Sequence, residues 1–229
     1  MRLSIIIPAL NEANNIRRTL LPLQALRQEG HEIILSDGGS EDDTKRQAQT
    51  LVDKLLDAPR GRAQQMNAGA AVATGNLLLF LHADTLLPDN AAQAIAAAAD
   101  GARPCWGRFD VRLSGRQPLL RLVEWMMNQR SRITGIATGD QGMFIQRTLF
   151  HQIGGFPPLA LMEDITLSRT LKRHAAPVCL RAKVTTSSRR WEEQGIVSTI
   201  FLMWRMRLAY FFGACPQRLA HAYQRGQQR

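Results

Sequence analysis

The sequence is poor in cysteine and has no glycine-rich dinucleotide fingerprint. Its three cysteines, among 229 residues, are widely spaced and form no Cys-x-x-Cys pair, which argues against a disulfide scaffold or structural zinc site and favours a reducing, cytoplasmic setting. The 17 glycines and 10 prolines are close to average usage, so a collagen-like or low-complexity chain is excluded. No Gly-x-Gly-x-x-Gly follows a candidate strand, which argues against a dinucleotide-binding dehydrogenase.

Long uninterrupted hydrophobic runs are also missing. The N-terminal run at residues 3–8 has the length of a buried strand and is too short for a signal-peptide core. The run at residues 196–212 is apolar at 13 of 17 positions, but Arg205 and Arg207 interrupt it and would each cost roughly 2.5–3.5 kcal/mol near the centre of a spanning helix. Two interpretations remain: a helix at a membrane interface with snorkelling arginines, or a helix packed on the domain or on a partner subunit.

Charge is distributed unevenly along the chain. Residues 1–164 carry 17 basic and 17 acidic side chains, whereas residues 165–229 carry 12 basic ones against only Glu192 and Glu193. Such an excess predicts a polyanionic neighbour or a solvated basic tail. Nucleic acid is the weaker candidate, because Trp191, Trp204 and Tyr210 do not form the stacking platform interleaved with basic residues that such binding uses. An anionic membrane surface stays open.

The first hundred residues alternate between strand-like and helix-like patterns. Strands are expected at 3–8, 32–37 and 77–82, with a short segment at 54–57 and helices at 12–28, 42–51, 61–73 and 90–99. This alternation predicts an α/β fold with a mostly parallel sheet and helices on both faces. Later, strands are expected at 107–113 and 139–146, helices at 119–128 and 164–174, and a basic helical extension at the C-terminal end.

Polar side chains follow several of the expected strands. Asn11 and Glu12 follow the first, Asp37 ends the second, and His82 and Asp84 end the strand at 77–82. The carboxyl ends of parallel strands form the ligand crevice of such sheets. Carboxylates that bind a divalent cation, together with arginines that bind phosphate, predict a site for a nucleotide diphosphate with Mg²⁺ or Mn²⁺.

Five short motifs lie in order along this framework: IPALNE, SDGGSEDDT, GRAQQMNAGA, HADT and EDITLSR. With them, residues 1–175 resemble family 2 glycosyltransferases, which have the GT-A fold. The GRAQQMNAGA, HADT and GDQGMF motifs further resemble a small bacterial subgroup that is linked by name to arsenosugar biosynthesis. The resemblance implies a nucleotide-binding half at 1–100, an acceptor and catalytic half at 101–175, and a basic, apolar helical region at 176–229.

The resemblance implies a set of residues for the nucleotide-sugar donor. These are Pro8, Asn11, Glu12, Asp37, Arg62, Asn67, His82 and Ala83. Asp37 would accept a hydrogen bond from the nucleobase, and Arg62 would face the donor phosphates or the base. Structural alternatives remain for both, since Asp37 could cap the following helix and Arg62 could lie on a solvated helix face.

The resemblance assigns the divalent cation, Mn²⁺ or Mg²⁺, to Asp84. Family members usually have an Asp-x-Asp pair here, and His82 takes the place of the first aspartate. The ribose contact of that aspartate is therefore in doubt. His82 could donate to a ribose hydroxyl, bind Mn²⁺ directly, or be a hydrogen-bonded structural residue.

Catalysis by an inverting transfer needs one base for the acceptor hydroxyl. The resemblance assigns this role to Asp164, with Glu163 as the other candidate, although either carboxylate could simply favour a helix N-terminus. Trp106, Asp140 and Gln141 would border the acceptor. That acceptor is expected to be a lipid-linked or small hydroxyl compound.

The expected protein is thus a cytoplasmic glycosyltransferase, either free or peripheral on the inner face of the plasma membrane. Because His82 departs from the pattern, a catalytically altered nucleotide-sugar or membrane-surface binding protein is one alternative. A sugar nucleotidyltransferase is another, although it would require a glycine-rich loop where residues 9–14 read ALNEAN. The sequence leaves a homo-oligomer open.

Overall fold

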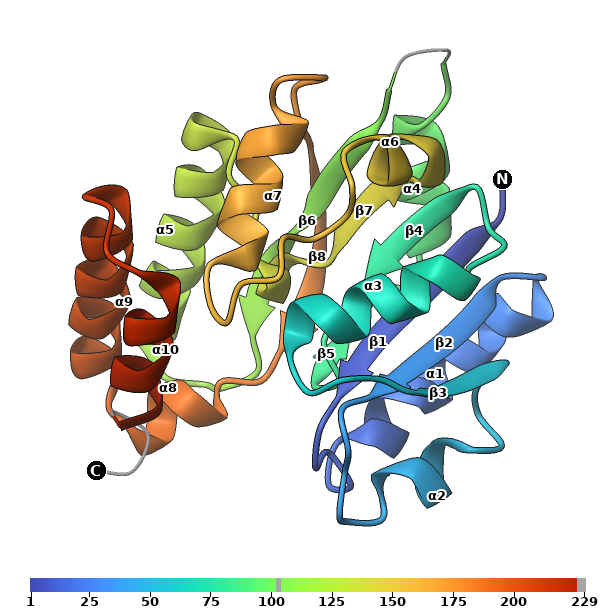
Figure 1. Ribbon diagram of the computed structural model, residues 1–229, viewed down its shortest axis with the longest axis horizontal. Helices are drawn as coiled ribbons and strands as arrows, with labels where there is room; N and C mark the ends of the chain where they lie inside the picture. The colour runs from blue at the N-terminus through green and yellow to red at the C-terminus, as the bar shows by residue number, and fades with distance from the viewer. Residues whose placement is uncertain (102–103, 226–229) are drawn as a thin grey trace.

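The computed structural model describes residues 1–101 and 104–225, which form one eight-stranded mixed sheet flanked by helices (Figure 1). The spatial order of the strands is β3-β2-β1-β4-β7-β6-β8-β5. The strands are β1 Leu3–Ala9, β2 Glu32–Asp37, β3 Lys54–Asp57, β4 Leu77–Phe80, β5 Thr85–Leu86, β6 Trp106–Leu113, β7 Met143–Gln146 and β8 Val178–Thr186.

Helices connect the strands and extend the chain beyond the sheet. They are α1 Ile16–Gln28, α2 Thr44–Ala48, α3 Arg62–Val72, α4 Ala91–Ala98, α5 Pro118–Thr134, α6 Arg147–Gln152, α7 Glu163–Leu171, α8 Arg189–Glu193, α9 Ile196–Phe211 and α10 Pro216–Arg225, with the 3₁₀ helix η1 at Gly139–Gln141. None of the described helices is long and apolar enough to cross a membrane.

Strand β1 shows why the sheet is covered on both faces. All seven of its residues are buried. Ile5 and Ile7 pack with α1, α2 and α4 in one hydrophobic cluster, whereas Ile6 packs with α3, α6 and α7 in another. A strand buried on both faces is typically a nearly continuous apolar run, and residues 3–7 match this apart from Ser4. The prediction of an α/β sheet with helices on both faces is confirmed.

The strand directions bring several carboxyl ends to one edge. β1 is parallel to β2 and β4, β7 is antiparallel to β4 and to β6, and β6 is parallel to β8. It follows that β6 and β8 run in the same direction as β1. Their last residues, Leu113 and Thr186, therefore lie at the same sheet edge as the segment that follows β4.

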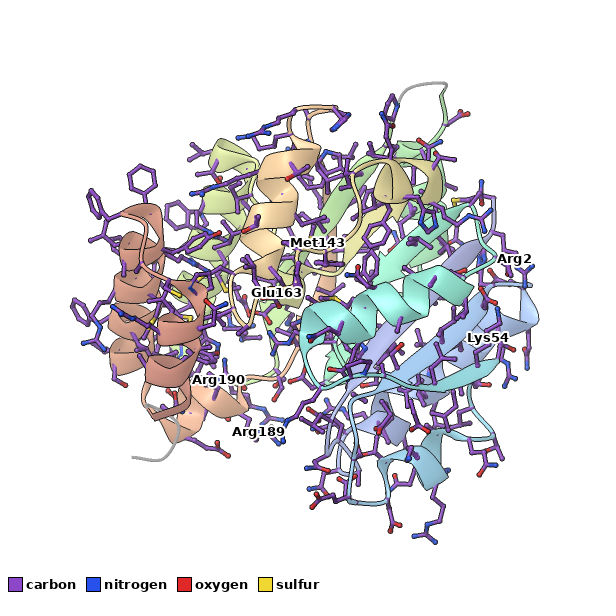
Figure 2. The ribbon with its side chains drawn as sticks, in the orientation of Figure 1. Arg2, Lys54, Met143, Glu163, Arg189 and Arg190 are labelled. Atoms are coloured by element: carbon purple, nitrogen blue, oxygen red, sulfur yellow. The ribbon has the colours of Figure 1, made fainter. Side chains whose placement is uncertain are left out.

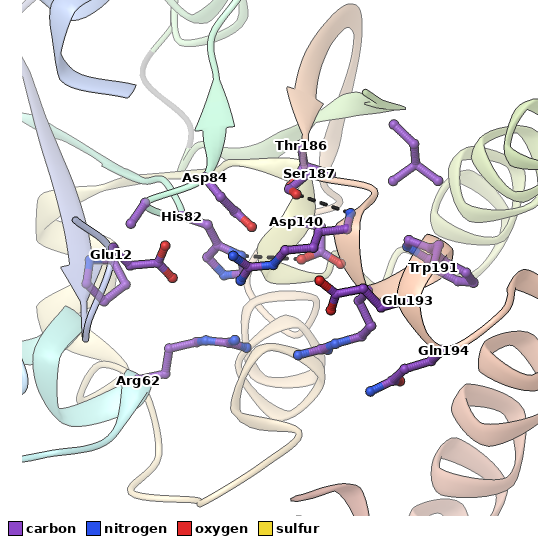
Figure 3. A pocket seen from close by; sticks show the side chains of 15 residues that line it. Glu12, Arg62, His82, Asp84, Asp140, Thr186, Ser187, Trp191, Glu193 and Gln194 are labelled. Atoms are coloured by element: carbon purple, nitrogen blue, oxygen red, sulfur yellow. Dashed lines mark hydrogen bonds and ion pairs between the residues drawn. The ribbon is translucent and has the colours of Figure 1, made fainter. Parts of the chain in front are cut away.

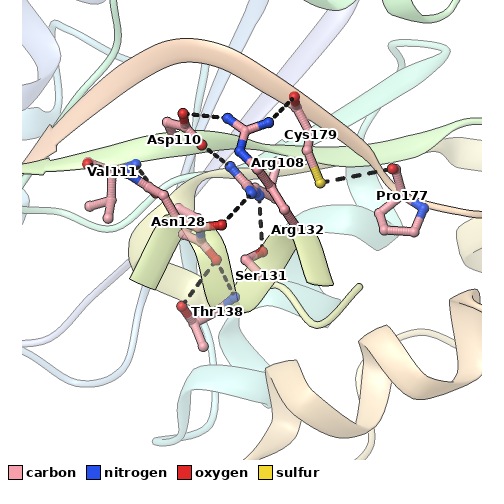
Figure 4. Close-up of polar contacts among 10 residues, drawn as sticks. Arg108, Asp110, Val111, Asn128, Ser131, Arg132, Thr138, Pro177 and Cys179 are labelled. Carbon is pink, nitrogen blue, oxygen red and sulfur yellow. Dashed lines mark hydrogen bonds and ion pairs between the residues drawn. The ribbon is translucent and has the colours of Figure 1, made fainter. Parts of the chain in front are cut away.

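A buried polar network fastens α5 to β6 (Figure 4). The guanidinium of Arg108, which is wholly buried, contacts Asp110 and donates to Ser131 Oγ at 2.9 Å. Asn128 bonds both backbone groups of Val111, at 2.9 and 3.0 Å. Every charge in this network has a partner, which is the condition for tolerating buried polar groups.

Two expected elements differ from the structure. Residues 178–186, placed in the helical C-terminal region, instead form β8 inside the sheet, so the sheet extends past the predicted boundary at 175. Pairing with β6 decides this, because the mixed apolar and basic sequence of β8 has no clean strand period. The strand expected at 139–146 splits into η1 and β7, since Gly142 has a φ of +59°.

Helices α8, α9 and α10 lie at one end of the molecule in Figure 1, beyond α5 and α7. Met206 of α9 and Leu219 of α10 pack with Met162 and Ile165 in a third hydrophobic cluster. This cluster holds the C-terminal helices against the start of α7, beside the carboxyl edge of the sheet.

Candidate active site

A first cavity of about 460 Å³ opens at the carboxyl edge of the sheet (Figure 3). Side chains from the two ends of the chain face each other across it, with Glu12 and Arg62 opposite Glu193 and Gln194. The full lining is Pro8, Glu12, Arg62, His82, Ala83, Asp84, Leu113, Asp140, Thr186, Ser187, Arg189, Arg190, Trp191, Glu193 and Gln194. Most of these residues are polar or charged, so the cavity suits a polar, anionic ligand.

A second cavity of about 120 Å³ adjoins the first. It is bordered by the start of α7, with Glu163 and Asp164, and by α9, with Met203, Met206 and Arg207. Both cavities share one wall, which consists of Arg62, His82, Asp140, Arg190 and Trp191. A group bound in one cavity is therefore next to a group bound in the other.

His82 and Asp140 contact each other in this shared wall, with 3.3 Å between Nδ1 and Oδ1. Burial acts to raise the pKa of Asp140, but the hydrogen bond and charge of His82, followed by Arg62 and Arg190, hold that pKa well below its usual range. The other ring nitrogen of His82 faces Gly139, where a Cβ would lie 2.4 Å from Nε2. His82 thus orients Asp140, and only glycine leaves room for the ring at position 139.

The Glu163–Asp164 pair begins α7 directly after a strained residue. Met162 has a φ of +68°, which is unusual for a residue with a side chain and typical of functional sites. Asp164 Oδ2 accepts a hydrogen bond from the Gly139 backbone N–H at 3.0 Å, and Oδ1 accepts one from Ile165 at 2.7 Å. These bonds hold the carboxylate of Asp164 at the edge of the second cavity.

Glu163 is more buried than its neighbour, and only 5% of its surface is exposed. Its Oε1 lies 4.0 Å from Nη1 of Arg62; Glu163 is labelled in Figure 2. Burial first, and then the negative charge of Asp164, raise the pKa of Glu163, and Arg62 only partly opposes this shift. The pair therefore gives the site one carboxyl group that holds its proton more tightly than an ordinary glutamate.

Among the described residues, no three His, Cys, Asp or Glu side chains come together to hold a metal ion. Asp84, which lines the first cavity beside Arg62 and Arg190, fits a different arrangement. Mg²⁺ is commonly bound by one or two carboxylates together with substrate phosphates and water, and this donor set suits such a shared cation.

Several expected site residues line neither cavity. Asp37 is wholly buried and accepts hydrogen bonds from the backbone of Gly39 and Ser40, at 2.9 and 2.8 Å. It therefore shapes the loop after β2 and does not cap the next helix, because α2 begins only at Thr44; its contact with the nucleobase stays a prediction. Asn11 is exposed, has a φ of +54°, and accepts from the backbone of Glu41 at 2.9 Å.

The other residues outside the cavities are structural as well. Asn67 bonds both backbone groups of Phe156, at 2.8 and 2.9 Å, and thereby ties α3 to the segment that follows α6. Gln141 is wholly buried, with its Oε1 bonded to the Thr138 backbone. Trp106 requires a correction, because it is wholly buried in the core and its Nε1 donates to the Ala175 carbonyl. It has no surface with which to meet an acceptor.

The sequence analysis missed the C-terminal contribution to both cavities. Arg189, Arg190 and Trp191 of α8 line the first cavity, and Arg207 of α9 lines the second. The guanidinium of Arg190 lies 4.6 Å from the ring centroid of Tyr223, which fixes its direction. The sequence feature that could have indicated this contribution is the excess of basic residues after position 164. That excess was interpreted only as a surface for a polyanionic neighbour or as a solvated tail.

Comparison with known proteins places this site in a family. The family model for "Glycosyl transferase family 2" matches residues 4–153. The uncharacterized glycosyltransferase Rv1514c of Mycobacterium tuberculosis is 29% identical over 98% of this chain and 90% of its own length. The undecaprenyl-phosphate 4-deoxy-4-formamido-L-arabinose transferase of Klebsiella pneumoniae is 30% identical over 66% of this chain, which spans half of that longer protein.

Solved structures show the same fold at low identity. Glucosyl-3-phosphoglycerate synthase from M. tuberculosis, in complex with Mn²⁺, UDP and glucosyl-3-phosphoglycerate, is 18% identical with a TM-score of 0.66, covering 93% of this chain and 80% of that one. The Staphylococcus aureus TarS fragment 1–349 is also 18% identical, with a TM-score of 0.65, and this chain spans 65% of its length. The chain has the GT-A-like fold, and it is a glycosyltransferase that belongs to glycosyl transferase family 2.

Proposed function

We propose that the protein transfers a sugar, with inversion, from a nucleoside-diphosphate sugar in the first cavity to a hydroxyl acceptor in the second. The observation that carries the proposal is the shared wall, which brings the Glu163–Asp164 pair beside a cavity lined by Asp84 and several arginines. Complexes of the glucosyl-3-phosphoglycerate synthase with Mn²⁺ and UDP support the donor class.

Inversion requires a single displacement at the anomeric carbon. The acceptor oxygen forms a bond to this carbon while the bond to the diphosphate oxygen breaks, and the electron pair leaves with the nucleoside diphosphate. Asp164 takes the proton of the acceptor hydroxyl. Arg62 and Arg190, which border both cavities, offset the negative charge on the departing diphosphate. A bound Mn²⁺ or Mg²⁺, held by Asp84, would supply further stabilisation of this charge.

Asp164 is the better base of the two carboxylates. Its oxygens are held by two backbone N–H groups, so the side chain has a fixed position at the cavity. Glu163 is buried, and its raised pKa means that it retains a proton more readily. A base must be able to take a proton from the acceptor, and the carboxylate of Asp164 lines the second cavity in a fixed position.

The substitution Asp164→Asn tests the assignment. We expect sugar transfer to fall about 10²- to 10⁴-fold, the usual contribution of a general base, while binding of the nucleoside diphosphate is retained. Transfer is measured as nucleoside-diphosphate release from a panel of UDP- and GDP-sugars with Mn²⁺ or Mg²⁺, and binding is measured by calorimetry. Asp89→Asn, at an exposed position, is the control.

Two results of this experiment would decide against the proposal. Transfer that survives Asp164→Asn unchanged would remove Asp164 as the base. If the protein binds the donor but transfers no sugar to any acceptor offered, it is instead a nucleotide-sugar binding protein. This alternative is open because His82 takes the place of the first aspartate of the Asp-x-Asp pair.

We also propose that α9 contacts an anionic membrane surface. One face of this helix carries exposed apolar side chains at intervals of three and four residues, here called the α9 stripe: Val197, Phe201, Trp204, Leu208 and Phe211. The opposite face is buried against the domain. A continuous apolar face on a strongly basic segment is typical of helices that lie at a membrane interface.

A further inference from the structure

Asp140 is the only carboxylate, among the described residues, that lines both cavities. The others border one cavity each, Glu12, Asp84 and Glu193 the first and Glu163 and Asp164 the second. About half of the Asp140 side chain is exposed, at 49%. Its negative charge is therefore open to a ligand at the junction where the two cavities meet.

The contact with His82 sets the direction of this carboxylate. Only 13% of the His82 side chain is exposed, and its Nδ1 lies 3.3 Å from Oδ1 of Asp140 (Figure 3). On the other side of the ring, a Cβ at Gly139 would lie 2.4 Å from Nε2. The imidazole is thus enclosed, and with its proton on Nδ1 it donates to Oδ1, which leaves the second oxygen of the carboxylate for a ligand.

An aspartate at position 82 could not play this part. It would set a second carboxylate against Asp140, and the two negative charges would repel each other. The imidazole of His82 instead offers a donor at the same place. The residue at position 82 therefore suits an anionic partner at position 140.

The segment that carries Asp140 also holds the proposed base. The backbone N–H of Gly139 donates to Oδ2 of Asp164 at 3.0 Å. The 3₁₀ helix η1 is closed by Gln141, whose Oε1 accepts from the Thr138 backbone N–H at 3.1 Å. Asp140 and Asp164 are consequently held at fixed relative positions by one short, hydrogen-bonded turn.

The proposed reaction places the transferred sugar beside Asp140. In a displacement with inversion, the acceptor oxygen approaches the anomeric carbon from the side opposite the departing diphosphate. With the diphosphate in the first cavity and the acceptor in the second, the sugar ring lies between them, at the wall that both cavities share. Hydroxyl groups of this ring are then the polar groups that meet the junction carboxylate.

We propose that Asp140, positioned by His82, binds hydroxyl groups of the sugar that is transferred, an inference that rests on the proposed function. An ionised carboxylate accepts hydrogen bonds from hydroxyl groups, and such charge-assisted bonds are short and strong. The indole of Trp191, in the same wall, offers an apolar surface to the ring. Asp140 thus contacts the donor sugar, and His82 acts through Asp140.

The diphosphate is the wrong partner for Asp140, because both are negatively charged. Arg62 and Arg190, in the same wall, match the diphosphate instead. Removing the carboxylate should therefore weaken binding of the sugar while it leaves binding of the diphosphate unchanged or makes it tighter. These opposite effects make the proposal testable with the donor and its sugar-free part.

Calorimetric titration with Mn²⁺ compares the two ligands. UDP and GDP are titrated alongside UDP-glucose, UDP-galactose, UDP-N-acetylglucosamine and GDP-mannose. For the sugar nucleotide that the wild type binds best, we expect Asp140→Ala to weaken binding at least about tenfold, as for loss of a hydrogen bond to a charged group. Binding of the free nucleoside diphosphate should not weaken. Asp89→Asn, at an exposed position, should change neither.

The outcomes separate this inference from the proposed function. Equal weakening of the sugar nucleotide and the free diphosphate would show that Asp140 serves the nucleotide or the fold. Unchanged binding of the sugar nucleotide would remove the contact, and both results would leave the donor site in place. If the wild type binds none of these nucleotides, the proposed function fails and the inference falls with it.

Two variants of His82 test its positioning role. The amide nitrogen of His82→Asn can take the place of Nδ1 and donate to Asp140, whereas His82→Leu removes the donor. We expect His82→Leu to weaken the sugar nucleotide selectively, and His82→Asn to retain most of the affinity. Combined with Asp140→Ala, His82→Leu should add no further loss, since it acts through Asp140. An additional loss, or weaker UDP binding in His82→Leu, would show that His82 contacts the nucleotide or supports the fold.

Discussion

Two buried glutamates, one in each half of the molecule, have opposite electrostatic environments. Glu32 on β2 has 3% of its surface exposed, and its carboxylate binds Ser4 Oγ at 2.6 Å, the Thr74 N–H at 2.9 Å and Lys54 Nζ at 2.8 Å (Lys54 is labelled in Figure 2). Burial acts to raise its pKa, but the bonds to Lys54, Ser4 and Thr74 lower it to about 2. Glu163 is as buried, yet its pKa is raised.

The arginines repeat this contrast. Arg108 is wholly buried and its guanidinium is bonded to Asp110, Ser131 and Asn128. Within the part of the chain that the structure describes, by contrast, Nε and Nη2 of Arg130 on α5 are buried without a hydrogen-bond partner. Burial alone therefore does not decide whether a charged group is satisfied by the protein.

We expect the largest effect on stability from Glu32→Gln, because this substitution removes the buried carboxylate that the protein itself satisfies. A pKa of about 2 against 4.5 for an ordinary glutamate corresponds to about 3 kcal/mol at neutral pH. This contribution is fully present above pH 4.5 and is lost as the pH falls toward 2. Urea unfolding at pH 7 and pH 3, with the exposed Glu41→Gln as control, measures it. An equal loss at both pH values would contradict the assignment.

The substitution Glu163→Gln should raise the stability of the folded protein, by less than Glu32→Gln lowers it. A raised pKa in the folded protein means that the charged form destabilises it, a cost present above the folded pKa and absent below the unfolded one. We therefore expect a higher Tm for the variant at pH 7 and no difference from the wild type near pH 4. A lower Tm at pH 7 would show that Glu163 is a structural residue like Glu32.

Substitutions in the α9 stripe should have the smallest effect on stability. We expect Phe201→Ser with Trp204→Ser to change the free energy of unfolding by no more than about 0.5 kcal/mol each, because both side chains are exposed. The same pair should abolish flotation with vesicles that contain anionic lipid. Unchanged flotation would remove the membrane proposal, and a wild-type dimer that the variant loses would assign the stripe to a second copy of the chain.

The N-terminal half was largely predictable from its residues. The strand at residues 3–8, the helices around 16–28 and 62–72, and the convergence of Glu12, His82 and Asp84 at one edge all follow from apolar periodicity and the rules of parallel sheets. The site was predictable where its residues directly follow strands. Trp106 was misplaced, because position in the chain shows that a residue is near an edge but not whether its side chain is already bonded or buried.

The C-terminal part was less predictable for a physical reason. Strand β8 acquires its role only through pairing with β6, and helices α9 and α10 acquire theirs only through packing on the start of α7. Residues 196–212 showed no clean amphipathic stripe because both faces of α9 are apolar, one covered by the domain and one exposed. Local sequence cannot distinguish two apolar faces when their difference arises from a neighbour elsewhere in the chain.

The amino-acid sequence alone determined the fold class, the family and the carboxyl edge at which polar residues gather, because these depend on local periodicity and on short motifs at strand ends. Only the tertiary structure decided which charges are satisfied, since hydrogen-bond partners such as Gly139 for Asp164, or Ser131 for Arg108, come from distant segments. It also brought Arg190 of α8 and Arg207 of α9, from the C-terminal end of the chain, into the lining of the second cavity, because packing between distant segments cannot be read from local sequence.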